Sequence, residues 1–217
     1  MSIIDERKRL LADRELRGSE FTLQLSDATD EWLYGLFTSV TENRADLALI
    51  AVGGYGRRDL SPLSDLDVLL LHNDAADIEA VAEALWYPIW DQGEKLGHSV
   101  RTINETLTLA SEDLDTATAL LSSRIIAGSQ ALANELSGKA IDQWKSKAKF
   151  WLPKLAESVH SRHRAKGEIA FMLEPELKEG RGGLRDVHAM GLANLNVHGP
   201  FEVEHHQLFE CYEVILR

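Results

Sequence analysis

The chain has 217 residues, 44% of them apolar and 27% charged, which is typical of a globular protein. Acidic residues outnumber basic ones by 35 to 23, and the net charge of −12 argues against nucleic acid as the main partner. One cysteine excludes an internal disulfide and a cysteine-based zinc site. With no bilayer-length apolar run and no signal-peptide centre, we expect a cytoplasmic protein that makes no membrane contact.

Apolar spacing predicts several helices and three short strands: helices at 3–16, 26–43 and 77–90, and strands at 47–52, 66–71 and 97–102. Pro88 should kink the third helix or end it early. Thr102 and Glu105 form a capping-box pattern, which predicts that another helix begins there. From about Ser111 the pattern is helical almost throughout, apart from a loop within 168–188.

Two aspartates in the stretch "AVGGYGRRDLSPLSDLDVLLLHND" (51–74) carry the clearest chemical signal. Asp65 and Asp67 are one residue apart, so a strand places them on the same face, where they repel unless a cation lies between them. Oxygen ligands at this spacing suit Mg²⁺. Upstream, Gly53 and Gly54 follow a strand and allow backbone N–H groups to approach a phosphate. Each motif alone is common in solvated turns, whereas the combination is specific.

The pattern of a glycine pair followed, about ten residues later, by D-x-D resembles the signature of the DNA polymerase beta-like nucleotidyltransferase superfamily. "VGGYGRRDLSPLSDLDVLLL", "LWYPIWDQGEKLGHSVRT" and "LEPELKEGRGGLRDVH" together resemble the N-terminal part of the bacterial PII-protein uridylyltransferases. The second block is also similar to the actinobacterial branch, which transfers AMP, so the base stays open. A sister family, the glutamine synthetase adenylyltransferases, shares the D-x-D but is less similar at "GHSVRT".

The resemblance implies transfer of UMP or AMP from UTP or ATP to a tyrosine of the trimeric PII signalling protein, with release of pyrophosphate. It implies that Asp65 and Asp67 are catalytic and bind two Mg²⁺ ions. It also implies that Gly53 and Gly54 hold the phosphates, while Ser64 either contacts the nucleotide or caps its turn. An acidic enzyme suits a protein acceptor better than a nucleic acid.

Cations that follow the glycine turn are further candidates. One of Arg57 and Arg58 is expected to meet a phosphate and the other to lie on the surface, and we select Arg57 for nucleotide binding. The superfamily often has a third carboxylate on a later strand, but "GHSVRT" has none. Asp91 and Glu94 lie just before it and are expected to be exposed turn residues, which leaves the general base unassigned.

A second candidate region is the loop "KEGRGGLRD", whose glycines precede a helix. Lys178 and Arg181 are expected to bind the nucleotide, because cations at a helix N-terminus favour an anion. For Arg185 and Asp186, a structural ion pair that ties the helical lobe to the catalytic one is equally expected.

Other aromatic and basic residues are expected to be structural. His98 and Arg101 should lie on opposite faces of their strand, so only one faces the site. Tyr55 is expected to pack rather than to stack on a base. Four histidines are interpreted as surface residues and four tryptophans as core residues: His160, His163, His205 and His206, and Trp86, Trp90, Trp144 and Trp151.

The expected fold is α+β: a polymerase beta-like lobe with a small mixed sheet, followed by a helical lobe. We expect N-terminal helices at 1–45, the catalytic core at 46–115 and a helical domain at 116–217 that carries the loop Lys178–Asp186. Because the final "HQLFECYEVILR" ends within a helical pattern, we expect a longer natural polypeptide, with the family's HD hydrolase and ACT domains beyond this piece.

Two alternatives remain at this stage. One is an adenylyltransferase of a sister family that acts on glutamine synthetase or a small molecule. The other is a nucleotide-binding module without turnover. The substitution Asp65→Asn separates an enzyme from such a module, because it should abolish transfer in an enzyme and only weaken affinity in the module.

Overall fold

A computed structural model describes residues 3–42, 44–166, 173–174 and 176–195 of the chain. The chain forms two compact units, Met1–Ile141 and Asp142–Arg217, which are described separately below. Within the described residues, no helix is long and apolar enough to cross a membrane.

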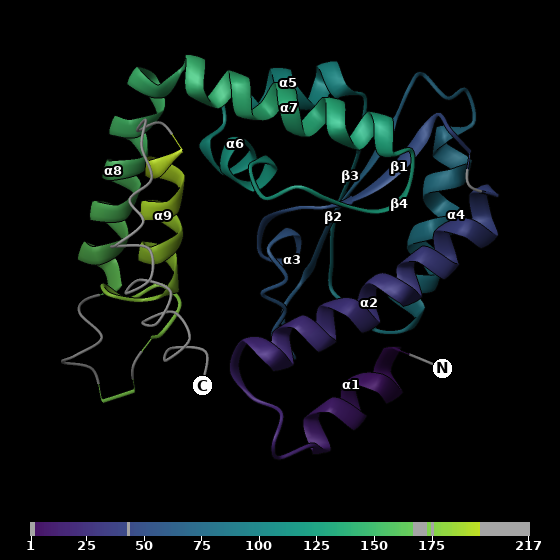
Figure 1. Cartoon of the computed structure of the whole chain (residues 1–217), viewed down its shortest axis with the longest axis horizontal. Coiled ribbons are helices and arrows are strands. Elements are labelled where there is room, and N and C mark those ends of the chain that lie inside the picture. Colours follow the sequence, from purple (N-terminus) through teal and green to yellow (C-terminus); the bar gives the residue numbers. More distant parts are fainter. Residues whose placement is uncertain (1–2, 43, 167–172, 175, 196–217) are drawn as a thin grey trace. The chain divides into compact units, whose positions relative to one another are not determined.

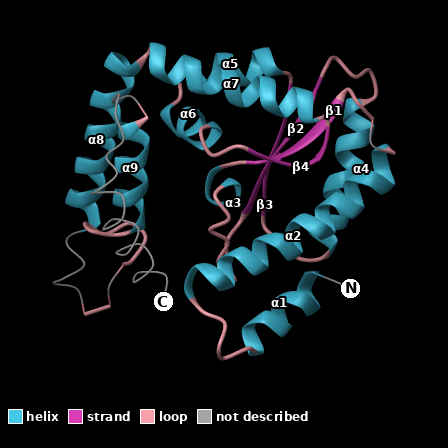
Figure 2. Ribbon diagram, in the orientation of Figure 1, coloured by secondary structure: helices cyan, strands magenta, loops and turns pink. Residues whose placement is uncertain are grey.

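The first unit is built on a four-stranded mixed sheet (Figure 2). Its strands are β1 (Leu47–Ala51), β2 (Leu66–His72), β3 (Leu96–Arg101) and β4 (Arg124–Gly128), in the order β3-β2-β1-β4. β1 runs antiparallel to both β2 and β4, whereas β2 and β3 are parallel. The expected α+β architecture with a small mixed sheet is confirmed, and the three strands expected from the sequence are present.

Nine helices are described (Figure 1): α1 (Ile3–Ala12), α2 (Gly18–Thr41), α3 (Gly53–Gly56), α4 (Ile78–Asp91), α5 (Ile103–Ala110), α6 (Leu114–Leu120), α7 (Gln130–Ser146), α8 (Ala148–Lys166) and α9 (Leu184–Asn194). The capping box at the start of α5 is confirmed, because Thr102 accepts from the Glu105 N–H and the Glu105 side chain accepts from the Thr102 N–H. Pro88 lies inside α4 but does not end it before Asp91. The expected helix at the end of the chain lies outside the described residues.

One apolar core joins the sheet to α1, α2 and α4. Alternate residues of β2, Leu66, Val68 and Leu70, enter this core and are at most 2% exposed. Residues of the opposite face, such as Leu69 and Leu71, are equally buried. Because both faces of the sheet are covered, its interior strands read as continuous apolar runs rather than as alternating ones.

The compact units differ from the expected domain ranges. The first unit extends to Ile141 instead of residue 115, because β4 pairs with β1 and completes the sheet. This segment was expected near a boundary and within a helical pattern. Helices α1 and α2 do not stand apart either, since Leu10 and Leu33 are part of the main core.

In the second unit, α8 packs against α9. Trp144 and Trp151 stack with ring centroids 5.9 Å apart and an interplanar angle of 10°, and both are buried. The core placement of Trp86, Trp144 and Trp151 is confirmed. The same expectation is wrong for Trp90, which is 43% exposed. Helical spacing placed Trp90 on the apolar face of α4, but it lies one residue from the helix end, where the core stops.

Candidate functional site

The carboxylate of Asp67 lies between two glycines, near the N-terminal end of β2. Asp67 is the second residue of β2, and in the parallel pairing of β2 with β3 its partner is Gly97. A Cβ placed on Gly97 would lie 2.3 Å from Asp67 Oδ1, and a Cβ placed on Gly53 would lie 3.6 Å from Asp67 Oδ2. The carboxylate therefore occupies space that a side chain at position 97 would fill, and position 53 is at ordinary contact distance from it.

Asp65 lies immediately before β2 and is exposed, whereas Asp67 is half-buried. Leu66, between them, points into the core. Since side chains alternate along a strand, the Asp67 carboxylate lies on the side opposite Leu66. Within the described residues, no group of three or more His, Cys, Asp or Glu side chains is arranged to hold a metal ion.

The glycine pair forms the start of a short helix rather than a simple turn. Gly53 has φ of 58°, a left-handed conformation that glycine adopts without a steric penalty. α3 follows β1 directly, and the N–H of Val52, which precedes it, donates to the backbone carbonyl of Asp67 at 3.0 Å. This bond joins the entrance of α3 to the strand that carries the aspartates.

Ser64 and the two arginines after α3 have partners within the chain. The Ser64 hydroxyl accepts from the Ser61 N–H at 2.9 Å, which is the turn-capping role foreseen as its alternative. Arg57 is exposed and its Nε lies 2.8 Å from Asp59 Oδ2, but one of its terminal nitrogens is 3.8 Å from where a Cβ on Gly54 would lie. Arg57 thus remains beside the glycine pair.

Arg58 is directed away from the glycine pair. Its guanidinium contacts Asp27 of α2 at 2.8 Å. Its backbone has φ of 66°, in the left-handed region that costs a non-glycine residue free energy.

β3 presents no carboxylate beside Asp67. His98 lies against the rings of Trp86 and Trp90, with centroids 5.3 and 5.4 Å apart. Alternation then places Arg101 on the other face of the strand, the one that contains Gly97. The expectation that His98 and Arg101 lie on opposite faces agrees with this arrangement.

The expectation that Glu94 is an exposed turn residue is wrong. Glu94 is 7% exposed, and its carboxylate accepts from Arg7 of α1 at 2.6 Å. The missing signal was long-range, because its partner lies 87 residues away in sequence. Asp91, in contrast, is exposed as expected.

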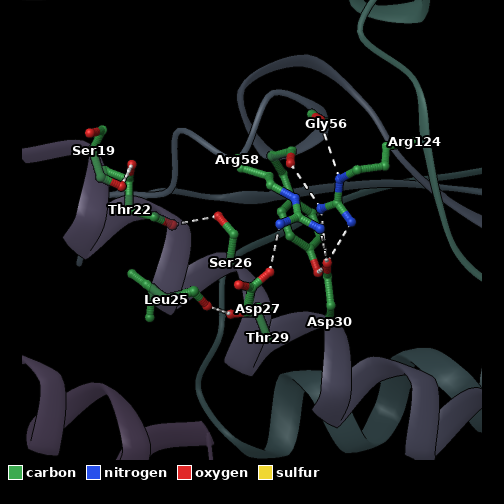
Figure 3. Close-up of polar contacts among 11 residues, drawn as sticks. Ser19, Thr22, Leu25, Ser26, Asp27, Thr29, Asp30, Gly56, Arg58 and Arg124 are labelled. Carbon is green, nitrogen blue, oxygen red and sulfur yellow. Dashed lines mark hydrogen bonds and ion pairs between the residues drawn. The ribbon is translucent and has the colours of Figure 1, made fainter. Parts of the chain in front are cut away.

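A polar cluster contacts the C-terminal end of α3, and two of its members were not predicted from the sequence (Figure 3). Arg124 of β4 forms a two-pronged ion pair with Asp30 of α2, with distances of 2.5 and 3.0 Å. Asp30 also accepts from the hydroxyl of Tyr55, which is 1% exposed, so the packing role expected for Tyr55 is confirmed. Burial and the neighbouring Asp30 carboxylate raise the pKa of Tyr55 well above 10.0, which keeps its hydroxyl a donor.

In the second unit, Asp186 does not pair with Arg185. Asp186 instead accepts from Arg162 and His163 of α8 and from the Gly182 N–H at 2.8 Å, while Arg185 contacts Glu179 at 2.8 Å. The expected Arg185–Asp186 pair between lobes is therefore wrong, because every described partner lies within this unit.

The same contacts correct the surface interpretation of one histidine. His163 Nε2 lies 2.8 Å from Asp186, so this histidine has an acidic partner. His160 is exposed as expected, whereas His205 and His206 lie outside the described residues. Lys178 and Arg181 are exposed on the loop before α9, and their predicted contact with a nucleotide stays a prediction.

Two family models match the chain. A nucleotidyltransferase domain matches residues 33–127, the range that includes α3, both aspartates and all four strands except the last residue of β4. A model described as GlnD PII-uridylyltransferase matches residues 150–208. Together with the sheet, the first match confirms the expected nucleotidyltransferase fold.

Curated relatives from several bacteria are described as bifunctional uridylyltransferase/uridylyl-removing enzymes. A bifunctional uridylyltransferase/uridylyl-removing enzyme of Streptomyces coelicolor is 44% identical over 186 residues, which cover 85% of this chain and 22% of that protein. The Mycobacterium tuberculosis enzyme is 45% identical over 175 residues, covering 78% and 22%. The Phenylobacterium zucineum enzyme is 37% identical over 232 residues, covering 96% and 24%. The chain thus spans less than a quarter of the length of these relatives, and the expected family relationship is confirmed.

Among solved structures, a toxin–antitoxin complex with AMP-PNP aligns with 60% of this chain at 16% identity and a TM-score of 0.38. This likeness is weak.

Proposed function

Because the chain is homologous to the bifunctional uridylyltransferase/uridylyl-removing enzymes over most of its own length, we propose that it transfers a nucleotidyl group to a PII protein. The proposed donor is UTP and the acceptor a tyrosine hydroxyl of trimeric PII in the cytoplasm, with pyrophosphate released. The names of the relatives favour UTP, and ATP is the second donor to test. Nucleic acid and membrane have no part in this reaction.

The observation that carries the proposal is the position of Asp67 between Gly53 and Gly97, inside the match to a nucleotidyltransferase domain. The first N–H groups of a helix have no partner within that helix, and the partial positive charge there favours an anion. We propose that Gly53 and Gly54 hold the β- and γ-phosphates, since neither has a Cβ to keep a phosphate away. Arg57, beside Gly54, adds a positive charge to the same place.

The carboxylates of Asp65 and Asp67, at the start of β2, fit Mg²⁺ as ligands. Mg²⁺ prefers a few protein carboxylates and completes its shell with phosphate oxygens and water, so two aspartates suffice as protein ligands. Asp65 and Asp67 would hold the ions, two by our proposal. When bound, Mg²⁺ lowers the pKa of the attacking hydroxyl and neutralises charge on the leaving oxygens.

The residues of the chain then have distinct roles in the transfer. The acceptor hydroxyl releases its proton to water, its oxygen attacks the α-phosphorus, the bond to the bridging oxygen breaks, and pyrophosphate leaves with the released electron pair. Gly53, Gly54 and Arg57 orient the phosphates for in-line attack, and Ser64 stabilises the turn that leads into the aspartates. For Lys178 and Arg181, on the loop before α9, the proposed role is nucleotide binding.

Intact mass spectrometry tests the proposal. Purified PII is incubated with the chain, Mg²⁺ and either UTP or ATP. We expect a mass increase of one uridylyl group per PII subunit, and its absence with both nucleotides would refute the proposal. Asp67→Asn should abolish the increase, whereas Asp91→Asn, which alters an exposed carboxylate at the end of α4, should leave it unchanged.

A further inference from the structure

α3 is held at its C-terminal end by a single side chain from the far edge strand of the sheet. Arg124 of β4 donates from Nε to the Gly56 carbonyl and from Nη2 to the Tyr55 carbonyl, both at 3.3 Å. These carbonyls belong to the last two residues of α3, and that of Tyr55 also accepts from the Arg58 N–H at 3.0 Å. A cation at this end also complements the helix dipole.

The same guanidinium is anchored to a different element. Asp30 of α2 accepts from both terminal nitrogens of Arg124, and from the Tyr55 hydroxyl at 2.7 Å (Figure 3). The Arg124 and Asp30 side chains are 22% and 18% exposed. The guanidinium also lies over the Tyr55 ring, with Cζ 5.5 Å from the ring centroid. Backbone and side chain of Tyr55 are therefore fixed by one ion pair.

A close backbone contact completes the arrangement. A Cβ on Gly56 would lie 2.0 Å from the Ser122 carbonyl oxygen and 3.1 Å from that of Ala51. The segment that leads into β4 thus lies directly against the end of α3. The short helix has contacts from α2, β1 and the β4 segment, and a helix of four residues has only one turn in which to absorb a shift.

We propose that the Asp30–Arg124 pair positions the glycine turn for phosphate binding and so acts through α3 on the transfer reaction. A one-turn helix is about 6 Å long, so displacement of its carbonyl end also displaces the Gly53 and Gly54 N–H groups at its start. The start of α3 is joined to Asp67 through the Val52 N–H. Loss of the pair therefore changes the geometry between the phosphates and the carboxylates. This inference rests on the function proposed above.

Arg124→Ala removes the contacts to both carbonyls and to Asp30. Arg124→Lys retains the charge but lacks the planar fork that reaches acceptors on three residues at once. Arg44→Ala is the matched control, because Arg44 also bridges two elements, contacting Asp46 at 2.7 Å and Asp77 at 2.6 Å, but lies in the turn before β1, away from α3. Each variant is compared with the wild type at a temperature where all are folded.

Steady-state kinetics separate positioning from stability. For Arg124→Ala we expect kcat/KM for the nucleotide to fall by about 10- to 100-fold, since small misplacements of a bound substrate cost rates of that order. The KM for the nucleotide should rise while the KM for PII stays unchanged, and Arg124→Lys should recover part of the loss. A purely structural role lowers kcat through the folded fraction and leaves both KM values unchanged. That result would overturn the inference.

Hydrogen exchange provides a readout that does not depend on activity. The N–H groups of Gly56 and Arg57 donate to Val52 and Gly53, and their protection reports on α3 itself. We expect at least tenfold faster exchange of these amides in Arg124→Ala and no change in Arg44→Ala. Unchanged protection in Arg124→Ala would refute the positioning role even in an active enzyme. A wild type that neither binds nor transfers a nucleotide, but whose α3 loosens in Arg124→Ala, would refute only the proposed function.

Discussion

The substitution Gly97→Ala tests whether the direction of the Asp67 carboxylate matters for the chemistry. A Cβ at position 97 would lie 2.3 Å from Asp67 Oδ1, whereas ordinary contact begins at 3.4 Å. The oxygen must therefore move by about 1.1 Å. Gly97 does not have a positive φ, so alanine itself fits the backbone and only the end of the Asp67 side chain has to move.

The expected changes in stability and rate differ in size. Alanine gains about 0.5–1 kcal/mol over glycine inside a strand. Forcing Asp67 about 30° from its rotamer costs about 0.5–1.5 kcal/mol, so the two terms nearly cancel in the free energy of unfolding. A displacement of about 1 Å in a group that orients the reaction can cost about 100-fold in rate. Gly97→Ala should thus lose transfer activity without losing stability.

The assay combines nucleotidyl transfer with chemical denaturation. Gly35→Ala is the control, because a Cβ at position 35 of α2 meets nothing within 4 Å. In an Asp67→Ala background the clash is absent, so adding Gly97→Ala should raise the free energy of unfolding by about 0.5–1 kcal/mol. Transfer within about twofold of wild type for Gly97→Ala, at unchanged stability, would refute the role given to the Asp67 carboxylate.

Three further predictions concern stability. Burial raises the pKa of Asp186, but hydrogen bonds from the Gly182 N–H and two α8 side chains lower it more, so its pKa lies below the ordinary 3.8. The ionised Asp186 therefore contributes to the free energy of unfolding. This contribution is complete above the unfolded pKa and is lost as the pH falls through the lower folded pKa. The thermal-melting difference between wild type and Asp186→Asn should accordingly be large at neutral pH and shrink in acid. Thr102→Ala should cost about 1 kcal/mol in urea denaturation because it removes the capping box of α5. Arg7→Ala should cost about 3 kcal/mol by the same measurement, since the Glu94 carboxylate would stay buried without its cation, and Arg7→Ala combined with Glu94→Gln should cost less.

Local patterns predicted the parts of the fold whose signal lies within a few residues. The helix at 77–90 has apolar residues at helical spacing and the strand at 66–71 is a short apolar run, and the structure has α4 and β2 there. The capping box of Thr102 was predictable for the same reason, because both of its bonds span three residues. The glycine pair and D-x-D likewise lie close together in sequence.

What the sequence could not predict depends on contacts between distant segments. β4 contains only two apolar residues before its final Ala-Gly, too few for a periodic signal, and becomes a strand by pairing with β1. Asp30 and Arg124 are 94 residues apart, and Arg7 and Glu94 are 87 apart. The sequence around a charged residue does not indicate a partner so far away in the chain, so such a residue is predicted to be solvent-exposed. Both ion pairs were missed for this reason.

The register of β3 explains why the residue opposite Asp67 is a glycine. Position 97 faces Asp67 directly, and a side chain there would collide with the Asp67 carboxylate. The next residue on the same face, Ser99, is two positions along the strand, about 6.6 Å farther from the glycine turn. A carboxylate on β3 would thus either displace Asp67 or lie beyond it. The lack of a side chain at position 97 is therefore a condition for the observed place of the Asp67 carboxylate.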